Sequence, residues 1–329
     1  KLAGVFEHRE LRSWCKLAVL LGVVFGSLAA LAYLGAWSAW FLIPIASVFA
    51  TAAAMLGHEG SHRSFSASPA RNALLVYLVF PLFSGLGALY WKNKHDREHH
   101  AHPNVEGVDP DIKPFPFVSS RGDHEGSGPK ARWFQRNCQS WLFWPMSTLM
   151  AIGMRRSSIL YLARYPKKHE RAWRIELACV IGHYTGWIVI PCILWGPAAF
   201  LLYVLLWAGV GVCLALVFAP AHMGLPIMRE RNHEWQHQLE TTRNLELPRF
   251  VSFFFVGLDY QVEHHLFPKI PHQNLPKAAR ITRAWCKQNG VTYKSEPYLS
   301  ALADARRFMR DAWDRESITV AEVLELAAG

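Results

Sequence analysis

The chain has 329 residues, of which 51% are apolar, and a formal net charge of +10. The apolar share is too high for an ordinary soluble domain of this length, while the long polar stretches exclude a chain that lies wholly in lipid. Lys and Arg that flank membrane helices account for the positive charge. No pattern of a known nucleic-acid-binding module is present, so we expect no nucleic-acid partner.

Long apolar runs recur along the chain in a pattern that predicts four membrane spans, because roughly 20 apolar residues cross a bilayer. The predicted spans are approximately 15–33, 38–57, 175–195 and 197–219. Very short connections join the first two spans and the last two, so we expect two helical hairpins. Lys and Arg concentrate before the first span and in the long connecting segments. The positive-inside rule therefore predicts a multi-pass membrane protein with both termini and all long loops in the cytosol.

A further apolar run at 72–91 does not suit a fifth span, because histidine groups lie on both sides of it. A shared metal site would require these groups on the same side of the membrane. We therefore predict a surface-lying, re-entrant or cap-buried helix here, which Pro81, Gly85 and Gly87 would help to bend. Residues 58–174 and 220–329 would then form one cytosolic helical cap. The expected fold is all-α, with residues 1–329 as a single membrane domain.

The sixteen histidines are unevenly distributed. Eight of them lie in three groups or directly after the last predicted span: His58, His62, His95, His99, His100, His222, His264 and His265. A spacing of four residues places two rings on one helix face, as for His58 with His62 and for His95 with His99, and His100 lies beside the second pair. Imidazole binds iron, copper, zinc and nickel. Eight imidazoles are too many for one metal and suit two, so we predict a two-metal centre at the membrane boundary.

Other polar residues near these groups suggest supporting roles. A metal-bound His usually donates its second ring N–H to a carboxylate or carbonyl. The nearby acids available for this role are Asp96, Glu98, Asp109, Asp111 and Glu263. We interpret His233 and His237 as cap surface or as outer support, and His183, alone in a span, as a core residue.

The segment from His58 to His62 also matches H-E-x-x-H, the motif of zinc proteases. In that interpretation Glu59 is the general base and one zinc ion activates water. The interpretation leaves most of the clustered histidines without a role. A metal transporter would instead place histidines inside the spans, whereas these groups lie at the ends of spans or in loops.

The three groups resemble the histidine boxes of membrane fatty acid desaturases. They read H-x3-H at 58–62, H-x3-H-H at 95–100 and Q-x2-H-H at 261–265. The segments 95–111, 235–244 and 257–275 are also similar to that family. Gln in place of the first His of the third box is typical of its front-end, acyl-lipid subgroup. The resemblance extends from Met55 to Leu275, about two thirds of the chain.

The resemblance implies an enzyme that uses O₂ and two non-haem irons to introduce a cis double bond into an acyl chain bound to a lipid, to CoA or to a carrier protein. It implies the eight histidines as iron ligands. Gln261 occupies a ligand position of the acyl-CoA relatives, where it would be a weak ligand, hold a water or orient a neighbour. Phe218 occupies the position of an Asn in those relatives.

The same resemblance bears on electron supply and on the reaction. Many front-end relatives carry a fused haem domain with a His-Pro-Gly-Gly signature, which this sequence lacks. We therefore expect a separate ferredoxin, rubredoxin or b-type cytochrome to supply electrons. Related hydroxylases and acetylenases use similar boxes, so hydroxylation and acetylenation remain alternatives to desaturation.

Overall fold

The computed structural model describes residues 4–112, 116–165 and 170–323. All the predicted site residues lie within these ranges. The two chain ends, for which we predict a cytosolic location, lie outside them. Helices dominate the described residues, in agreement with the expected helical membrane fold.

Four helices among the described residues are long and apolar enough to cross a membrane, as predicted. They are Glu10–Leu34, Ala36–Ser61, Arg171–Trp195 and Ala198–His222. Each differs from its predicted span by only a few residues at the ends. The elements that form them are α1 (Glu10–Leu34), η1 (Ala36–Ser38), α2 (Ala39–Ser61), α9 (Arg171–Tyr184), η5 (Thr185–Val189), α10 (Ile190–Trp195) and α11 (Ala198–His222).

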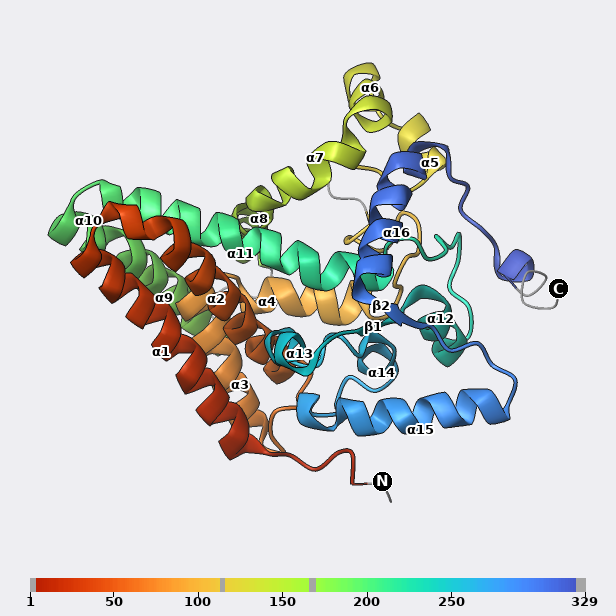
Figure 1. The fold of residues 1–329 in the computed structure, drawn as a ribbon, viewed down its shortest axis with the longest axis horizontal. Helices are drawn as coiled ribbons and strands as arrows, with labels where there is room; N and C mark the ends of the chain where they lie inside the picture. The colour runs from red at the N-terminus through yellow and green to blue at the C-terminus, as the bar shows by residue number, and fades with distance from the viewer. Residues whose placement is uncertain (1–3, 113–115, 166–169, 324–329) are drawn as a thin grey trace.

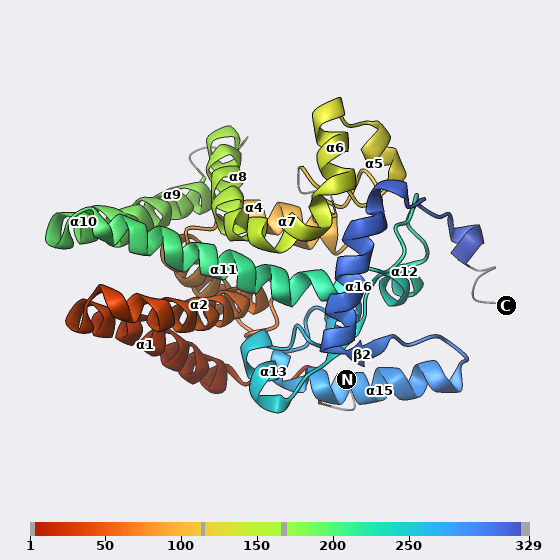
Figure 2. The same cartoon turned by 45° about the horizontal axis from the view of Figure 1, so that its top comes forward.

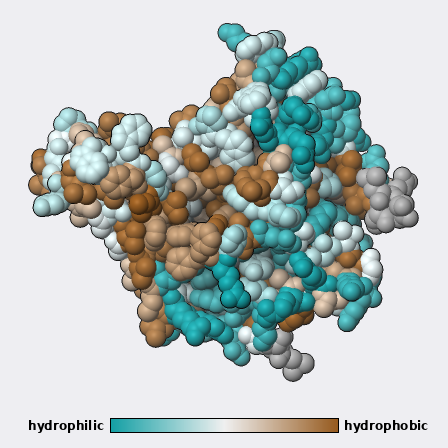
Figure 3. All heavy atoms as spheres, in the orientation of Figure 1, coloured by the Kyte–Doolittle hydropathy of each residue, from teal (hydrophilic) through white to brown (hydrophobic). Residues whose placement is uncertain are grey.

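The spans lie together on one side of the molecule (Figures 1 and 2). Helix α1 packs along α2, and α2 packs along α11. Trp37, Trp40 and Trp195 are exposed at the short connections between spans. Trp at such positions is typical of a membrane–water interface. The surface is rich in apolar residues over the spans and more hydrophilic on the opposite side (Figure 3).

We call the remaining described residues, 62–112, 116–165 and 223–323, the cap. Part of the cap packs beside α2 and α9, and the rest lies beyond the spans (Figure 1). Its helices after the second histidine box are α5 (Arg121–Glu125), α6 (Pro129–Asn137), α7 (Gln139–Met146), η4 (Ser147–Leu149) and α8 (Met150–Arg164). Those after the last span are α12 (Glu234–Thr241), α13 (Arg249–Phe255), α14 (Gln261–Leu266), η6 (His272–Asn274), α15 (Leu275–Gln288), α16 (Tyr298–Asp311) and η7 (Ala312–Asp314).

A small sheet in the cap departs from the all-α prediction. Strands β1 (Asn244–Glu246) and β2 (Ser295–Pro297) pair in parallel, with Asn244 opposite Ser295. Strands this short show no alternation of apolar and polar residues, which is the sequence signal for a strand. The pairing of β1 with β2 holds the segment before α13 beside the start of α16.

The apolar run at 72–91 is bent, as predicted. It comprises α3 (Pro69–Tyr77) with η2 (Leu78–Ser84), followed by α4 (Ala88–Trp91) with η3 (Lys92–His99), and the two halves meet at 113°. Gly85 lies at the break with a φ of 69°, a conformation that favours glycine. Gly57 of α2 lets η2 approach closely, because a Cβ there would lie 2.8 Å from side-chain atoms of Val79 and Phe80.

Polar side chains from α8 and α9 satisfy the broken helix ends at this bend. The His183 ring contacts the Leu82 carbonyl through Nδ1 at 3.1 Å, and Arg155 Nε donates to the Ser84 carbonyl at 2.7 Å. On the other side of the break, the Leu89 N–H donates to Glu176 Oε2 at 2.8 Å. The Arg155 guanidinium thus faces the carbonyl end of one helix, as the helix dipole favours, and a carboxyl oxygen accepts from the N–H end of the next.

The largest apolar core lies between the spans and this bend. Leu20, Leu56, Phe80 and Trp207 belong to it and are fully buried. Because α2 and α11 both pack into this core, their last residues, His58 to Ser61 and His222, lie at the same end of the molecule. The histidine centre is built at that end.

Candidate metal centre

The eight predicted histidines converge in two groups. One group contains His58, His62, His95, His100 and His264, and the other contains His99, His222 and His265. Within each group the candidate ligand nitrogens all lie within 4.8 Å of one another. Four separate elements supply these rings: the end of α2, η3 with the residue after it, the last residue of α11, and α14. The structure therefore brings together every histidine that the sequence singled out.

The second histidine box is divided between the two groups by a π-helix. Element η3 is a π-helix, and the His100 N–H donates to the His95 carbonyl, five residues earlier. His95 and His100 consequently contribute to the same group, while His99 contributes to the other. The sequence prediction placed His95 and His99 on one helix face, and their rings do stack, with centroids 5.2 Å apart. His95 and His99 also form a third, overlapping group of possible ligands with Asp111. Single π-helical turns are rare and occur frequently at functional sites.

The first group has the spacing of ligands around one ion. The Nε2 atoms of His58 and His95 lie 2.8 Å apart, and those of His62 and His58 lie 3.2 Å apart. His100 Nε2 lies 3.2 Å from His95 Nε2 and 3.1 Å from His264 Nε2. Ligand nitrogens about 2.1 Å from a shared ion and at right angles would be roughly 3 Å apart. The measured separations fit this arrangement.

The second group is held from outside by three hydrogen bonds. His99 Nδ1 lies 3.1 Å from both oxygens of Asp109, and His222 Nδ1 lies 3.1 Å from the Thr241 carbonyl. His265 Nδ1 lies 3.0 Å from Gln238 Oε1. Such contacts fix each ring with Nε2 free to bind. His222 Nε2 is buried without a hydrogen-bond partner, as expected of a nitrogen placed for a metal.

The surroundings keep most of these rings neutral, whereas burial of His99 is outweighed by the Asp109 carboxylate, which raises the pKa of His99 above the ordinary value. Burial, followed by repulsion from His99, lowers the pKa of His62 to about 3. Burial, followed by the neighbouring imidazoles, holds the pKa values of His100, His264 and His265 well below the ordinary value. Only the neutral ring offers a lone pair to a metal. An all-imidazole donor set in two groups suits two transition-metal ions.

Gln261 is the remaining predicted ligand. Its side chain is buried at the start of α14, and its Oε1 has no hydrogen-bond partner among the described residues. It precedes His265 by one helical turn, so the two residues lie on the same face of α14. Phe218 also lies at the centre, with its ring centroid 6.4 Å from that of His58 and 6.2 Å from that of His95. Its ring offers an apolar wall and no lone pair.

The acids near the boxes differ in what they contact. Asp109 contacts His99 as expected, Asp111 lies 3.6 Å from the same ring, and Asp96 lies 3.7 Å from His62. Glu98 instead accepts a hydrogen bond from Asn93, and Glu263 accepts from Asn244 and Tyr293. These last two carboxylates therefore support the surrounding helices rather than a histidine of the centre.

Glu59, the acid of the H-E-x-x-H motif, is bonded to the start of the 3₁₀ turn η6. Its carboxylate accepts the backbone N–H of His272 at 2.9 Å and contacts His272 Nδ1 at 3.0 Å. A general base must be within reach of the water it activates. Because both oxygens of Glu59 are bonded to His272, the geometry does not support the zinc-protease interpretation.

Residues of α12 were missed as contacts of the centre. Gln238 and Thr241 contact His265 and His222, and both lie in the segment 235–244 that resembles the known family. The resemblance of that segment to the known family was a signal in the sequence for these contacts. His233 is exposed, as one predicted alternative states, whereas His237 is buried and contacts the Pro103 carbonyl at 2.8 Å. His237 thus supports the loop after the second box.

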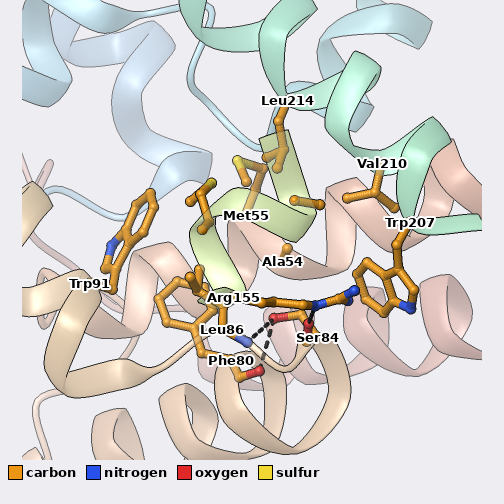
Figure 4. Close-up of a pocket in the computed structure, with 12 residues that line it drawn as sticks. Ala54, Met55, Phe80, Ser84, Leu86, Trp91, Arg155, Trp207, Val210 and Leu214 are labelled. Atoms are coloured by element: carbon orange, nitrogen blue, oxygen red, sulfur yellow. Dashed lines mark hydrogen bonds between the residues drawn. The ribbon is translucent and has the colours of Figure 1, made fainter. Parts of the chain in front are cut away.

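An apolar cavity of about 30 Å³ lies between α2, α8, α11 and the bend (Figure 4). Trp91 lines it near the centre, where its ring stacks on His95 with centroids 4.4 Å apart. Met55, one turn before His58, also lines the cavity. At the far end the Arg155 guanidinium lies 3.9 Å from the ring centroid of Trp207. The space is small and apolar, and one of its lining residues, Trp91, contacts the first histidine group.

Comparison with known proteins is consistent with this site. Residues 35–297 match the family model described as fatty acid desaturase. Among curated proteins, "Fatty acid desaturase 3" of Bos taurus is 27% identical over 262 residues, which is 78% of this chain and 57% of the relative. "Acyl-lipid (8-3)-desaturase" of Rebecca salina is 29% identical over 262 residues, 76% of this chain and 58% of the relative. The chain thus spans somewhat more than half the length of these relatives.

Proposed function

The chain belongs to the fatty acid desaturase family, and on that premise we propose that it introduces a cis double bond into a fatty acyl chain with O₂ as the oxidant. The observation that carries the proposal is the convergence of eight buried imidazoles into two adjacent groups. The acyl-lipid relative from Rebecca salina favours a lipid-bound substrate over a free acid. Acyl chains bound to CoA or to a carrier protein are the alternative substrates, and the test described below includes them.

The eight histidines would hold two irons, five rings at one ion and three at the other. Bound reduced iron supplies the activation of O₂ for C–H oxidation. One acyl chain, one O₂, two electrons and two protons give one double bond and two molecules of water. Two of the four electrons that reduce O₂ come from the acyl chain, and a separate carrier supplies the other two.

The protein's own residues position the substrate. The apolar cavity between Trp91 and Trp207 is where we place part of the acyl chain. At about 30 Å³ it is too small for that chain, so its walls must separate when substrate binds. Trp91 and Phe218 present apolar surfaces beside the first histidine group and exclude water from the reacting methylenes. Gln261, one turn before His265, would orient a water or a neighbouring ligand.

We further propose that the four spans cross the membrane as two hairpins, with the cap and the histidine centre in the cytosol. The bent run at 72–91 would enter and leave on that same side. This arrangement keeps every box on one face of the membrane, and the Lys- and Arg-rich connecting segments favour the cytosolic orientation. The exposed tryptophans at the opposite ends of the spans would lie at the far membrane surface.

The test is fatty-acid profiling by gas chromatography with mass spectrometry in a host that expresses the chain. We expect a new unsaturated acyl species, located in lipid-class fractions, that disappears in the His264→Ala/His265→Ala variant. The matched control is His233→Ala, an exposed histidine outside both groups, which should retain the product. A hydroxylated or acetylenic product would instead show that the chain catalyses hydroxylation or acetylenation. Full product formation by the double variant would contradict the site.

A further inference from the structure

Helices α12 and α15 form an outer layer over α14, the helix that carries His264 and His265. Helix α14 packs against both of them. Leu239, Val262 and Cys286, one residue from each helix, share a small buried apolar cluster. Packed helix axes lie about 8–10 Å apart. The outer surface of this layer is therefore only one helix away from the second histidine group.

Helix α12 connects that surface to the centre through hydrogen bonds. Gln238 contacts His265 Nδ1 at 3.0 Å through Oε1 and donates from Nε2 to the His100 carbonyl at 2.9 Å. Gln238 thus contacts one residue from each histidine group. One turn earlier in α12 stands Trp235, which is 42% exposed. Its ring meets the ring of Trp285 on α15 edge to face, with centroids 5.6 Å apart.

The exposed residues of α15 around this tryptophan pair include basic and apolar side chains. We define the tryptophan face as Trp235, Arg280, Ile281, Ala284, Trp285 and Lys287. Trp285 and Ile281 are 46% and 47% exposed, values that are high for residues with so much apolar surface. Helix α15 contains Lys and Arg but no Asp or Glu. Exposed aromatic residues with Arg nearby are enriched at protein interfaces.

The position of α15 favours a soluble partner over a lipid surface. The helix starts near the beginning of α1, where Gln273 Nε2 donates to Ser13 Oγ at 2.7 Å. From there it runs away from the spans in both views of the molecule (Figures 1 and 2). Trp285 and Lys287 belong to its last turn, at the end most distant from the spans.

We propose that the tryptophan face is the docking site of an acidic one-electron carrier protein. The inference rests on the proposed desaturase function, which requires two electrons per double bond. Each docked carrier would be oxidised by one electron and the metal centre reduced by one, so two docking events serve one turnover. Basic residues attract the acidic partner, the tryptophan pair supplies apolar contact, and α12 links the contact to the histidines.

The test uses the full chain in lipid nanodiscs with two probes, an acidic [2Fe–2S] ferredoxin and the soluble domain of an acidic b-type cytochrome. Binding is measured by surface plasmon resonance at low and high salt, with iron-loaded and with iron-free protein. We expect salt-sensitive binding of at least one probe. In the Arg280→Glu/Lys287→Glu variant its Kd should rise about tenfold or more, because charge reversal slows association. Trp285→Ala should also weaken binding, with a smaller change in salt dependence.

The matched control is Lys130→Glu/Arg132→Glu, two exposed basic residues of α6, which lies on the opposite side of the cap (Figure 1). This control should change Kd less than twofold, compared with the tenfold rise expected for the docking variant. In turnover assays the docking variant should raise KM for the carrier, while the rate with dithionite as reductant stays unchanged. Equal effects of the two variants, or no salt-sensitive binding of either probe, would overturn the docking site. Carrier binding without any lipid product would instead contradict the proposed function alone.

Discussion

Two of the buried clusters of polar side chains among the described residues differ in what their polar atoms contact. At the bend between η2 and α4, Arg155, His183 and Glu176 each bond a backbone group that the broken helix leaves without a partner. In the metal centre, by contrast, ring nitrogens face other ring nitrogens at 2.8 to 3.2 Å. His222 Nε2 has no partner at all among the described residues.

The difference separates polar residues that hold the fold from those that await a ligand. A buried polar group without a partner costs free energy, so a folded chain retains it only for a reason. The bend cluster is explained by the backbone it completes, although Arg155 Nη2 and Glu176 Oε1 also lack partners among the described residues. The histidine centre completes no backbone: the outward nitrogens of its second group are anchored, while the inward nitrogens of both groups converge. Substitutions in the two clusters should therefore have opposite consequences for iron and for stability.

The largest expected effect on iron comes from His222→Ala, which removes one of three rings from the second group. We expect the iron content of purified protein to fall from two ions toward one per chain, with loss of the unsaturated product. Metal analysis by plasma mass spectrometry measures the stoichiometry. His183→Ala is the paired control from the bend cluster and should retain both ions in the protein that folds. Equal iron loss in both variants would contradict the distinction between the clusters.

A smaller effect on iron is expected from Asp109→Asn. The Asp109 carboxylate orients His99, and loss of such a contact typically weakens metal affinity about 10- to 100-fold. Dialysis against a graded series of chelator concentrations would measure the change. Glu98→Gln provides the control, because Glu98 bonds Asn93 rather than a histidine. Iron retention in Asp109→Asn equal to that in the control would contradict the proposed role of Asp109.

The smallest effect on iron, and a clear one on stability, is expected from Arg155→Met. A hydrogen bond from a charged group contributes about 1.5–3 kcal/mol, and Met keeps much of the apolar volume. Burial lowers the pKa of Arg155 to about 10, so the residue remains charged at neutral pH. We expect a lower unfolding temperature by differential scanning fluorimetry, with iron per folded chain unchanged. Iron loss without destabilisation would place Arg155 in the metal centre instead.

The sequence predicted most of what depends on local patterns. Apolar run length predicted the four spans, and histidine spacing predicted seven of the eight rings. His222 was predicted from its place directly after the last span and from the family resemblance. The break at Gly85 to Gly87 followed from the requirement that His62 and His95 share one site. Each of these is a property of a short segment or a simple geometric constraint.

The parts that the sequence did not predict depend on tertiary contacts. The division of the second box needed the π-helical register of η3, which packing selects and periodicity does not reveal. The contacts of Gln238 and Thr241 join residues distant from the boxes in sequence. The partner of Glu59 is His272, more than two hundred residues away. No local rule identifies such a pair.

The π-helix at 92–99 also limits how this site could be transferred to another protein. Its H-x3-H-H motif, grafted onto an ideal α-helix, would turn the histidine at the position of His100 away from that of His95. The grafted helix would present the rings at the positions of His95 and His99 to one ion. It would lack a correctly placed ring for the other ion. A designer would have to copy the extra residue in the turn, and with it the surrounding packing that keeps a longer, less favourable turn in place. The sequence motif can therefore be transferred to another protein only together with its π-helical backbone.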